Sequence, residues 1–178
     1  MRRASSVKPL VGVLIGSDSD LPVMAGCARV LEEYGIGYEA RVLSAHRTPD
    51  DTARYVRAAE GRGLRVLVAG AGGAAHLAGA VAAHTSLPVI GVPLASSPLG
   101  GFDALLATVQ MPPGVPVATM GVGPMGAANA GHFAVAILAL GDAGLRRKLR
   151  ERRQRVAAEI LVKSRDLDRR LREIPKSR

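Results

Sequence analysis

The chain has 178 residues, 48% hydrophobic and 3% aromatic, which fits one domain of ordinary size with an aliphatic core. Its single cysteine, Cys27, excludes an intrachain disulfide, and one cysteine with four scattered histidines excludes a metal cage of the zinc-ribbon type. No apolar stretch is long enough to span a membrane, and the apolar run near the N-terminus is too short for a signal peptide. We therefore expect a cytoplasmic protein.

The net charge of +9 lies entirely in the C-terminal part of the chain. Residues 1–144 hold ten Lys/Arg and ten Asp/Glu, whereas residues 145–178 hold fourteen Lys/Arg and five Asp/Glu. This asymmetry predicts a basic N-terminal extension over 1–9, a neutral catalytic domain over 10–144 and a basic C-terminal helix over 145–178.

Strand-like and helix-like patterns alternate along the whole chain. In chain order they predict a strand over 10–15, a helix over 21–34, a strand over 38–43, a helix from 49 to about 61–63, a strand over 65–69, a helix over 74–84, a strand over 87–92, a short helix over 103–109, a strand over 117–120, and helices over 125–140 and 146–172. Cys27 falls on the apolar face of the first helix, where we expect it to be buried.

Repeated strand–helix units with short connections predict a parallel sheet with helices on both faces, a three-layer, doubly wound α/β fold. Five strands favour a flavodoxin-like arrangement, although the order of the strands does not follow from the sequence. In such sheets, ligands bind beyond the carboxyl ends of the strands. The loops that follow the strands are therefore the places to look for a site.

The loop after the first predicted strand, residues 16–20, combines a glycine with two serines and two aspartates. Serine hydroxyls and free N–H groups at a helix start can hold an anion, and Asp20 can accept hydrogen bonds from a ribose diol. Helix capping by Ser19 or Asp20 explains the same residues without a ligand. The loop matches neither the dinucleotide-binding fingerprint nor a Walker loop, so it does not indicate binding of NAD or ATP.

The loop after the second strand reads Ser44-Ala45-His46-Arg47-Thr48-Pro49. Thr48 is a suitable helix N-cap and Pro49 a suitable first helical residue. Arg47 offers a permanent charge in a geometry that suits phosphate, and an imidazole such as that of His46 can both donate and accept a proton near neutral pH. A surface histidine beside a capping threonine is the alternative explanation.

Three glycines in residues 70–73 let the backbone of the loop after the third strand approach a ligand closely. His76 follows at the start of a helix, where it fits either a binding role or a neutral capping and packing role. The long loop after the fourth strand has a length that is often functional. Together these loops predict a site for a small phosphorylated ligand at one edge of the sheet.

Several of these runs, in order and with unchanged spacing, resemble the PurE family of N5-carboxyaminoimidazole ribonucleotide mutases. The matching runs are Gly16–Asp20, Ser44–Pro49, Ala69–Leu77, Gln110–Pro112, Gly114–Val117 and Gly126–Ala130. The resemblance covers about residues 10–155. It implies a flavodoxin-like fold, a homo-octamer, no metal or nucleotide cofactor, and transfer of a carboxylate from the exocyclic nitrogen to C4 of an aminoimidazole ribotide.

The resemblance also assigns roles to residues of the predicted site. It implies that His46 is the general acid and base, that Asp20 binds the ribose hydroxyls, and that Gly72, Gly73 and His76 line the pocket for the carboxylate or CO2. The phosphate and its loop would be held by Ser17, Ser19, Ser44 and Arg47. The remaining residues of the implied substrate site are Ala45, Ala71 and Leu77.

A second branch of the family uses free CO2, but Arg47-Thr48-Pro49 and the run from Gly72 to His76 resemble the mutase branch. Two departures from the family pattern are Ala78, where proline is usual, and Gly131-His132-Phe133, which replaces an aliphatic stretch. Neither touches the implied acid–base group, but His132 could alter a subunit contact.

The C-terminal helix places leucines, a valine and an isoleucine near one stripe among its arginines and lysines, so we expect it to pack on a neighbouring subunit. A nucleic-acid-binding arm is the competing interpretation, which the absence of aromatic residues in this tail disfavours. We thus expect no nucleic-acid or membrane partner. Two other functions stay open: a nucleotide sensor with a DNA-binding tail, and a related carboxylase acting on another mononucleotide, such as a pyridinium precursor of the nickel-pincer cofactor.

Overall fold

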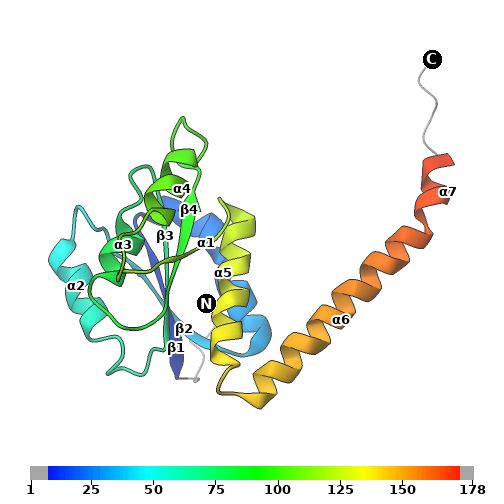
Figure 1. Cartoon of the computed structure of the whole chain (residues 1–178), viewed down its shortest axis with the longest axis horizontal. Helices are drawn as coiled ribbons and strands as arrows, with labels where there is room; N and C mark the ends of the chain where they lie inside the picture. Colours follow the sequence, from blue (N-terminus) through cyan, green and yellow to red (C-terminus); the bar gives the residue numbers. More distant parts are fainter. Residues whose placement is uncertain (1–7, 173–178) are drawn as a thin grey trace. The chain divides into compact units, whose positions relative to one another are not determined.

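The computed structural model describes residues 8–172, apart from the side chain of Asp168 (Figure 1). Of the predicted N-terminal extension, residues 1–7 lie outside the described part, and Pro9 already belongs to the first strand. The chain forms two compact units, with the boundary between Leu138 and Ala139.

The first unit is built on a five-stranded parallel sheet with the order β2-β1-β3-β4-β5. Its strands are β1 (Pro9–Ile15), β2 (Gly37–Val42), β3 (Val66–Gly72), β4 (Val89–Leu94) and β5 (Ala118–Thr119). This order is that of a flavodoxin-like doubly wound sheet, so the predicted fold class is confirmed. The chain adds β2 on one side of β1 and then β3 on the other, so the order of the strands switches between β1 and β3. In sheets of this kind a crevice opens beyond the carboxyl ends of the strands at such a point.

Helices cover both faces of the sheet (Figure 1). The helical segments of this unit are the 3-10 turn η1 (Asp18–Asp20) and the helices α1 (Leu21–Tyr34), α2 (Pro49–Arg57), α3 (Leu77–Ala82), α4 (Phe102–Val109) and α5 (Pro124–Leu138). The helices α1 and α5 pack against each other on one face, and α2 and α3 lie together on the other. Their apolar sides bury the aliphatic residues of the central strands, including Leu14, Leu67 and Ile90.

Small residues bring α1 and α5 into close contact. A Cβ atom built on Gly131 of α5 would lie 2.8 Å from Cβ of Val30 and 2.9 Å from the carbonyl oxygen of Cys27, so only glycine fits there. Cys27 itself is fully buried, as predicted. Burial raises the pKa of its thiol to about 12, which leaves the group uncharged and unreactive at neutral pH.

Several boundaries differ from the prediction; strand β4, for example, runs over Val89–Leu94 instead of 87–92. Strand β3 continues to Gly72 and α3 starts only at Leu77, because the residues between them form a tight turn in which Gly73 and Ala75 adopt φ values of 60° and 46°. Helix α2 ends at Arg57, before the glycines that were expected to stop it.

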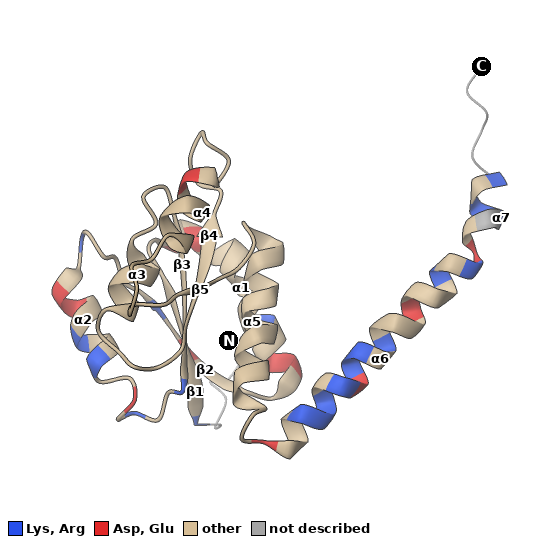
Figure 2. Ribbon diagram, viewed as in Figure 1, with Lys and Arg blue, Asp and Glu red and all other residues tan. Residues whose placement is uncertain are grey.

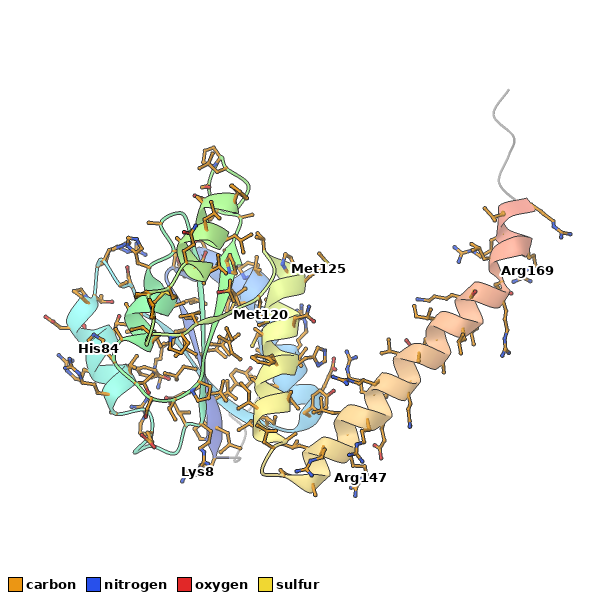
Figure 3. All side chains as sticks on the ribbon, viewed as in Figure 1. Lys8, His84, Met120, Met125, Arg147 and Arg169 are labelled. Carbon is orange, nitrogen blue, oxygen red and sulfur yellow. The ribbon has the colours of Figure 1, made fainter. Side chains whose placement is uncertain are left out.

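Up to Arg172, the C-terminal unit contains two helices, α6 (Ala143–Arg165) and α7 (Leu167–Arg172), where one was predicted. Helix α6 begins earlier than expected because the Asp142 side chain caps it, accepting a hydrogen bond of 3.0 Å from the backbone N–H of Leu145. Lys and Arg line both helices (Figure 2), and the side chains of Arg147 and Arg169 extend outward (Figure 3). None of the helices within residues 8–172 has the length and hydropathy needed to cross a bilayer.

Candidate functional site

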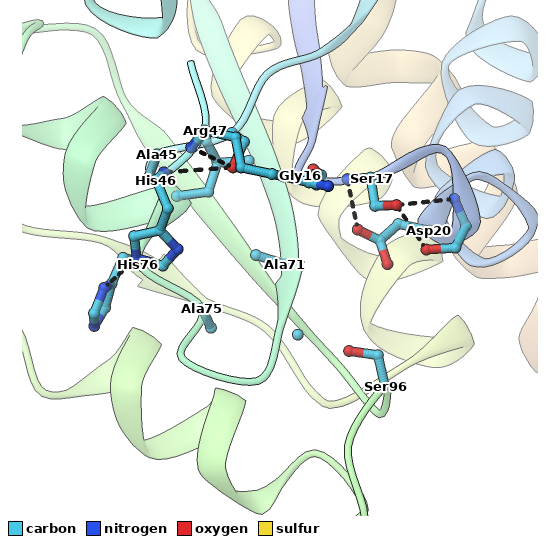
Figure 4. A pocket seen from close by; sticks show the side chains of 14 residues that line it. Gly16, Ser17, Asp20, Ala45, His46, Arg47, Ala71, Ala75, His76 and Ser96 are labelled. Carbon is cyan, nitrogen blue, oxygen red and sulfur yellow. Dashed lines mark hydrogen bonds between the residues drawn. The ribbon is translucent and has the colours of Figure 1, made fainter. Parts of the chain in front are cut away.

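A cavity of about 460 Å³ lies beyond the carboxyl ends of β1, β2, β3 and β4, at the edge where the sequence predicts a site (Figure 4). Its lining comes from the four loops that follow these strands. The lining residues are Gly16, Ser17, Ser19, Asp20, Ser44, Ala45, His46, Arg47, Ala71, Gly72, Ala75, His76, Leu77 and Ser96. A cavity of this size suits a small phosphorylated molecule.

The loop after β1 is held by a capping box. Ser17 is the N-cap of η1: its hydroxyl oxygen accepts hydrogen bonds from the backbone N–H and the hydroxyl of Ser19, at 3.4 and 2.9 Å. Asp20 completes the box by accepting a hydrogen bond of 3.1 Å from the backbone N–H of Ser17. Helix capping, the alternative to ligand binding, is therefore present; Asp20 takes part in it as expected, but its partner is Ser17 rather than Ser19.

Asp20 is only 8% exposed although it lines the cavity. Burial raises the pKa of this carboxyl above its ordinary value, and the charge of Asp18 adds to the rise. The N–H of Ser17 and the charge of Arg47 oppose this effect without cancelling it. A carboxyl group removed from water in this way gains most from a ligand that donates hydrogen bonds to it, such as a diol.

The loop after β2 is closed by its own polar side chains. The Ser44 hydroxyl accepts hydrogen bonds from the backbone N–H groups of His46 and Arg47, at 3.4 and 3.2 Å. Thr48 occupies the N-cap position of α2 as predicted, yet its hydroxyl turns back to Ser44, accepting from the N–H and donating to the carbonyl. The loop is thereby fixed before α2 begins.

Arg47 joins this loop to the one after β1. One terminal nitrogen of its guanidinium donates a hydrogen bond of 2.6 Å to the carbonyl oxygen of Gly16. The side chain remains exposed and lines the cavity, and a guanidinium carries five N–H donors, so donors remain for an anion.

His46 and His76 face each other inside the cavity (Figure 4). Nε2 of His46 lies 2.7 Å from Nδ1 of His76, and the rings meet edge to face with centroids 4.9 Å apart. One of these two nitrogens donates and the other accepts, so a single proton lies in this hydrogen bond. His76 stands at the N-cap position of α3 but makes no capping bond with its side chain, so its ring is turned to His46 instead.

The loop after β3 contributes residues to the lining of the cavity and makes a tight turn before α3. Every site residue that the sequence predicts lines the cavity except Gly73, whose positive φ makes the turn between β3 and α3. Ala75 shares this left-handed conformation at φ 46°, a backbone strain that is typical of functional loops.

Three lining residues were not predicted. Gly16 and Ala75 lie inside the motifs that were singled out, so their neighbours in sequence pointed to them. Ser96 lies in the long loop after β4, for which only length was a signal. Within residues 8–172, no three His, Cys, Asp or Glu side chains gather closely enough to hold a metal ion.

Comparison with known proteins assigns the chain that carries this site to a family. The profile of a family described as AIR carboxylase matches residues 10–159, which include all four loops of the cavity. The chain belongs to the AIR carboxylase family. The match covers the sheet and its helices and continues into α6, so the last residues of α6 and all of α7 lie beyond it.

Named relatives extend this result. The N5-carboxyaminoimidazole ribonucleotide mutase of Thermotoga maritima is 52% identical over 160 residues, which cover 90% of this chain and 92% of the relative. The phosphoribosylaminoimidazole carboxylase of Saccharomyces cerevisiae is 48% identical over 91% of this chain but only 28% of the yeast protein. The crystal structure of Treponema denticola PurE superposes with a TM-score of 0.79 at 26% identity, covering 89% of this chain and 98% of that structure. The predicted resemblance to the PurE family is confirmed.

Proposed function

We propose that the chain is an N5-carboxyaminoimidazole ribonucleotide mutase of de novo purine biosynthesis. It moves a carboxylate from the exocyclic nitrogen, N5, to C4 of the imidazole ring. The observation that carries the proposal is the pair of His46 and His76 within the cavity, in a chain that is 52% identical over 160 residues to a protein named as this mutase. A proton carrier beside a phosphate-sized anion site is what this reaction requires.

The ribotide enters with its phosphate toward Arg47. The serine hydroxyls of the first two loops and the N–H groups at the start of η1 supply further donors, and Asp20 accepts the ribose hydroxyls. This orientation leaves the aminoimidazole ring between the two histidines and the β3 loop, where Ala71, Ala75 and Leu77 give apolar contact.

The reaction takes two steps. In the first, the bond between N5 and the carboxylate carbon breaks, its electrons stay on N5, and His46 gives N5 a proton, which leaves aminoimidazole ribonucleotide and CO2. In the second, C4 attacks the CO2 carbon and His46 takes the proton that C4 loses. Atoms and protons balance, since the proton given to N5 is replaced by the one from C4. Acid–base assistance of this kind contributes roughly 10²–10⁴ to the rate.

His76 holds the His46 ring in place through the 2.7 Å hydrogen bond and shares its proton. The apolar residues of the β3 loop keep water from the ring, so that CO2 stays beside C4 until the new bond forms. No metal or nucleotide cofactor takes part in this scheme.

The proposed enzyme is cytoplasmic and assembles as a homo-octamer. Several large apolar side chains of α4 and α5 are exposed in the single chain and suit burial between subunits: Phe102, Leu106, Val109, Met125 and Phe133. The apolar residues of α6 and α7 are exposed as well, among them Val156, Ile160, Leu167 and Leu171, which supports packing of this basic tail on a neighbouring subunit.

A carboxylase that takes free CO2 is the second candidate, favoured by the yeast relative of that name. The two candidates use the same cavity and differ in the source of CO2. Purified chain is therefore given the N5-carboxylated ribotide without ATP or bicarbonate. We expect conversion to the C4-carboxylated product in a 1:1 ratio, and release of aminoimidazole ribonucleotide instead of product would contradict the mutase.

The role of His46 is tested with His46→Asn, which keeps the size and a hydrogen-bonding nitrogen but cannot carry the proton. We expect turnover to fall by roughly 10²–10⁴. Circular dichroism and binding of the ribotide check that the variant is folded. Near wild-type turnover in a folded variant would exclude His46 as the acid and base.

A further inference from the structure

Ser96 stands on the opposite side of the cavity from the histidine pair. It is the second residue after the end of β4, and β4 pairs with β3 up to Gly72 and Leu94. The side chain of Ser96 nonetheless lies beside Gly72, the last residue of β3. In Figure 4 its side chain points into the cavity, with Ala71 and Ala75 between it and the two imidazoles.

Gly72 makes room for the Ser96 hydroxyl. A Cβ atom built on Gly72 would lie 1.7 Å from Oγ and 2.9 Å from Cβ of Ser96, which means that the hydroxyl occupies the space where any other residue would carry its side chain. The backbone of Gly72 does not have a positive φ, so conformational freedom is not the reason for glycine here. The glycine and the serine form one feature of the cavity wall.

The Ser96 hydroxyl differs from the other serine hydroxyls of the cavity, which all take part in hydrogen bonds within the protein. Ser17 donates to Asp18, Ser19 donates to Ser17, and Ser44 accepts from two backbone N–H groups. No residue between 8 and 172 hydrogen-bonds the hydroxyl of Ser96. Ser96 is an exposed residue on the cavity wall, so its hydroxyl can hydrogen-bond a molecule that enters the cavity.

We propose that Ser96 binds the migrating carboxylate, donating a hydrogen bond to one of its oxygens while its carbon passes from N5 to C4. This inference rests on the proposed mutase function and adds a residue to it. A hydroxyl is a neutral donor that recognises the carboxylate of both substrate and product, and it exchanges no proton, because His46 carries the only proton that moves. One carboxylate oxygen stays anchored while the bond to N5 breaks and the bond to C4 forms, which keeps CO2 from leaving.

The test compares two ribotides that differ only in the carboxylate: aminoimidazole ribonucleotide and its C4-carboxylated form. Their dissociation constants are measured by calorimetry in the His46→Asn background, where bound ligand converts roughly 10²–10⁴ times more slowly. We expect Ser96→Ala to weaken the carboxylated ribotide roughly tenfold, the range of a hydrogen bond to a charged group, and to leave the other ribotide unchanged. The matched control is Ser97→Ala, since the Ser97 hydroxyl accepts from the N–H of Leu99 within its own loop and lies outside the cavity lining.

Retention of CO2 gives a second measurement, in the Ser96→Ala chain with His46 intact. The N5-carboxylated ribotide labelled with ¹³C is converted in the presence of unlabelled bicarbonate, and the label in the product is counted. We expect Ser96→Ala to lose label and to release more aminoimidazole ribonucleotide than Ser97→Ala does.

The outcomes separate this inference from the proposed function. If the wild-type chain does not interconvert the carboxylated ribotides, the mutase proposal fails, whatever Ser96 does. If the wild type is active but Ser96→Ala weakens both ribotides equally, or keeps the full preference for the carboxylated one, the role of Ser96 is overturned.

Discussion

Replacing Gly72 with alanine tests the close contact between Gly72 and Ser96 without any assay of activity. Two nonbonded heavy atoms cannot stand 1.7 Å apart, so the added methyl group forces the Ser96 hydroxyl out of its position. The carbonyl oxygen of Leu94, 3.0 Å from the new methyl, belongs to the backbone of β4 and yields little. We expect Gly72→Ala to lower the free energy of unfolding by about 1–3 kcal/mol, the usual cost of overpacking.

The size of the effect of Gly72→Ala should depend on what stands at position 96. In a Ser96→Ala background the hydroxyl is gone, whereas Cβ of residue 96 still lies 2.9 Å from the added methyl. Part of the cost is therefore recovered, and we expect the double variant to be more stable than the sum of the single effects by about 1 kcal/mol. Urea unfolding of the four proteins, followed by circular dichroism, gives this coupling energy directly.

Gly73→Ala is the matched control. A Cβ atom on Gly73 meets nothing within 4 Å, but the residue has a φ of 60°, so alanine there costs about 1 kcal/mol in backbone strain alone. That cost should be the same with either residue at position 96. The reasoning is refuted if the cost of Gly72→Ala is equal in both backgrounds within about 0.3 kcal/mol.

Three further predictions concern the rest of the molecule. Burial raises the pKa of Glu39, but the hydrogen bonds from Tyr55 and Arg62 outweigh it and hold this pKa below its ordinary value, so the stabilisation is present at neutral pH and lost as the pH falls through the folded-state pKa. Glu39→Gln should cost about 1 kcal/mol at pH 7 in urea unfolding, and the difference should shrink on acidification; a difference that is constant with pH contradicts this. Arg47→Gln should weaken binding of the ribotide roughly tenfold in calorimetry but leave the dephosphorylated riboside unaffected, and an equal loss for both would place Arg47 away from the phosphate. Leu14→Ala, at a fully buried position, should lower the free energy of unfolding by about 3 kcal/mol in urea unfolding. A decrease below about 1 kcal/mol would contradict the packing described.

The elements of the sheet follow from local patterns. The continuous apolar run of β1 and the helical spacing of the apolar residues of α1, followed by a glycine, predict the bounds of both elements to within one residue. This works because the pattern of buried side chains lies within each element and is visible in its own sequence. The order of the strands depends on which connections cross which face, and no local pattern carries that information. The early start of α6 rests on a single side chain, Asp142, whose capping role was not recognised.

The candidate site, like the fold, is only partly predictable from local patterns in the sequence. Motifs next to predicted strand ends identified the residues of the first three loops, because parallel strands bring their carboxyl ends to one edge. The sequence could not show that His46 and His76, thirty residues apart, share a hydrogen bond. Ser96 was missed for a related reason: its place depends on the course of the chain after β4. The role of its neighbour, Gly72, is seen only from the space that a side chain at that position would fill.

The hydrogen bond between the two imidazoles bears on how the enzyme returns to its starting state. An isomerisation takes up no net proton, so on the proposed reaction the pair ends each turnover with the protons with which it began. A bridge of 2.7 Å lets the proton settle on either ring while the ligand is being exchanged. The catalytic cycle then needs no outside acid or base to reset it, and the same machinery serves the forward and the reverse direction alike.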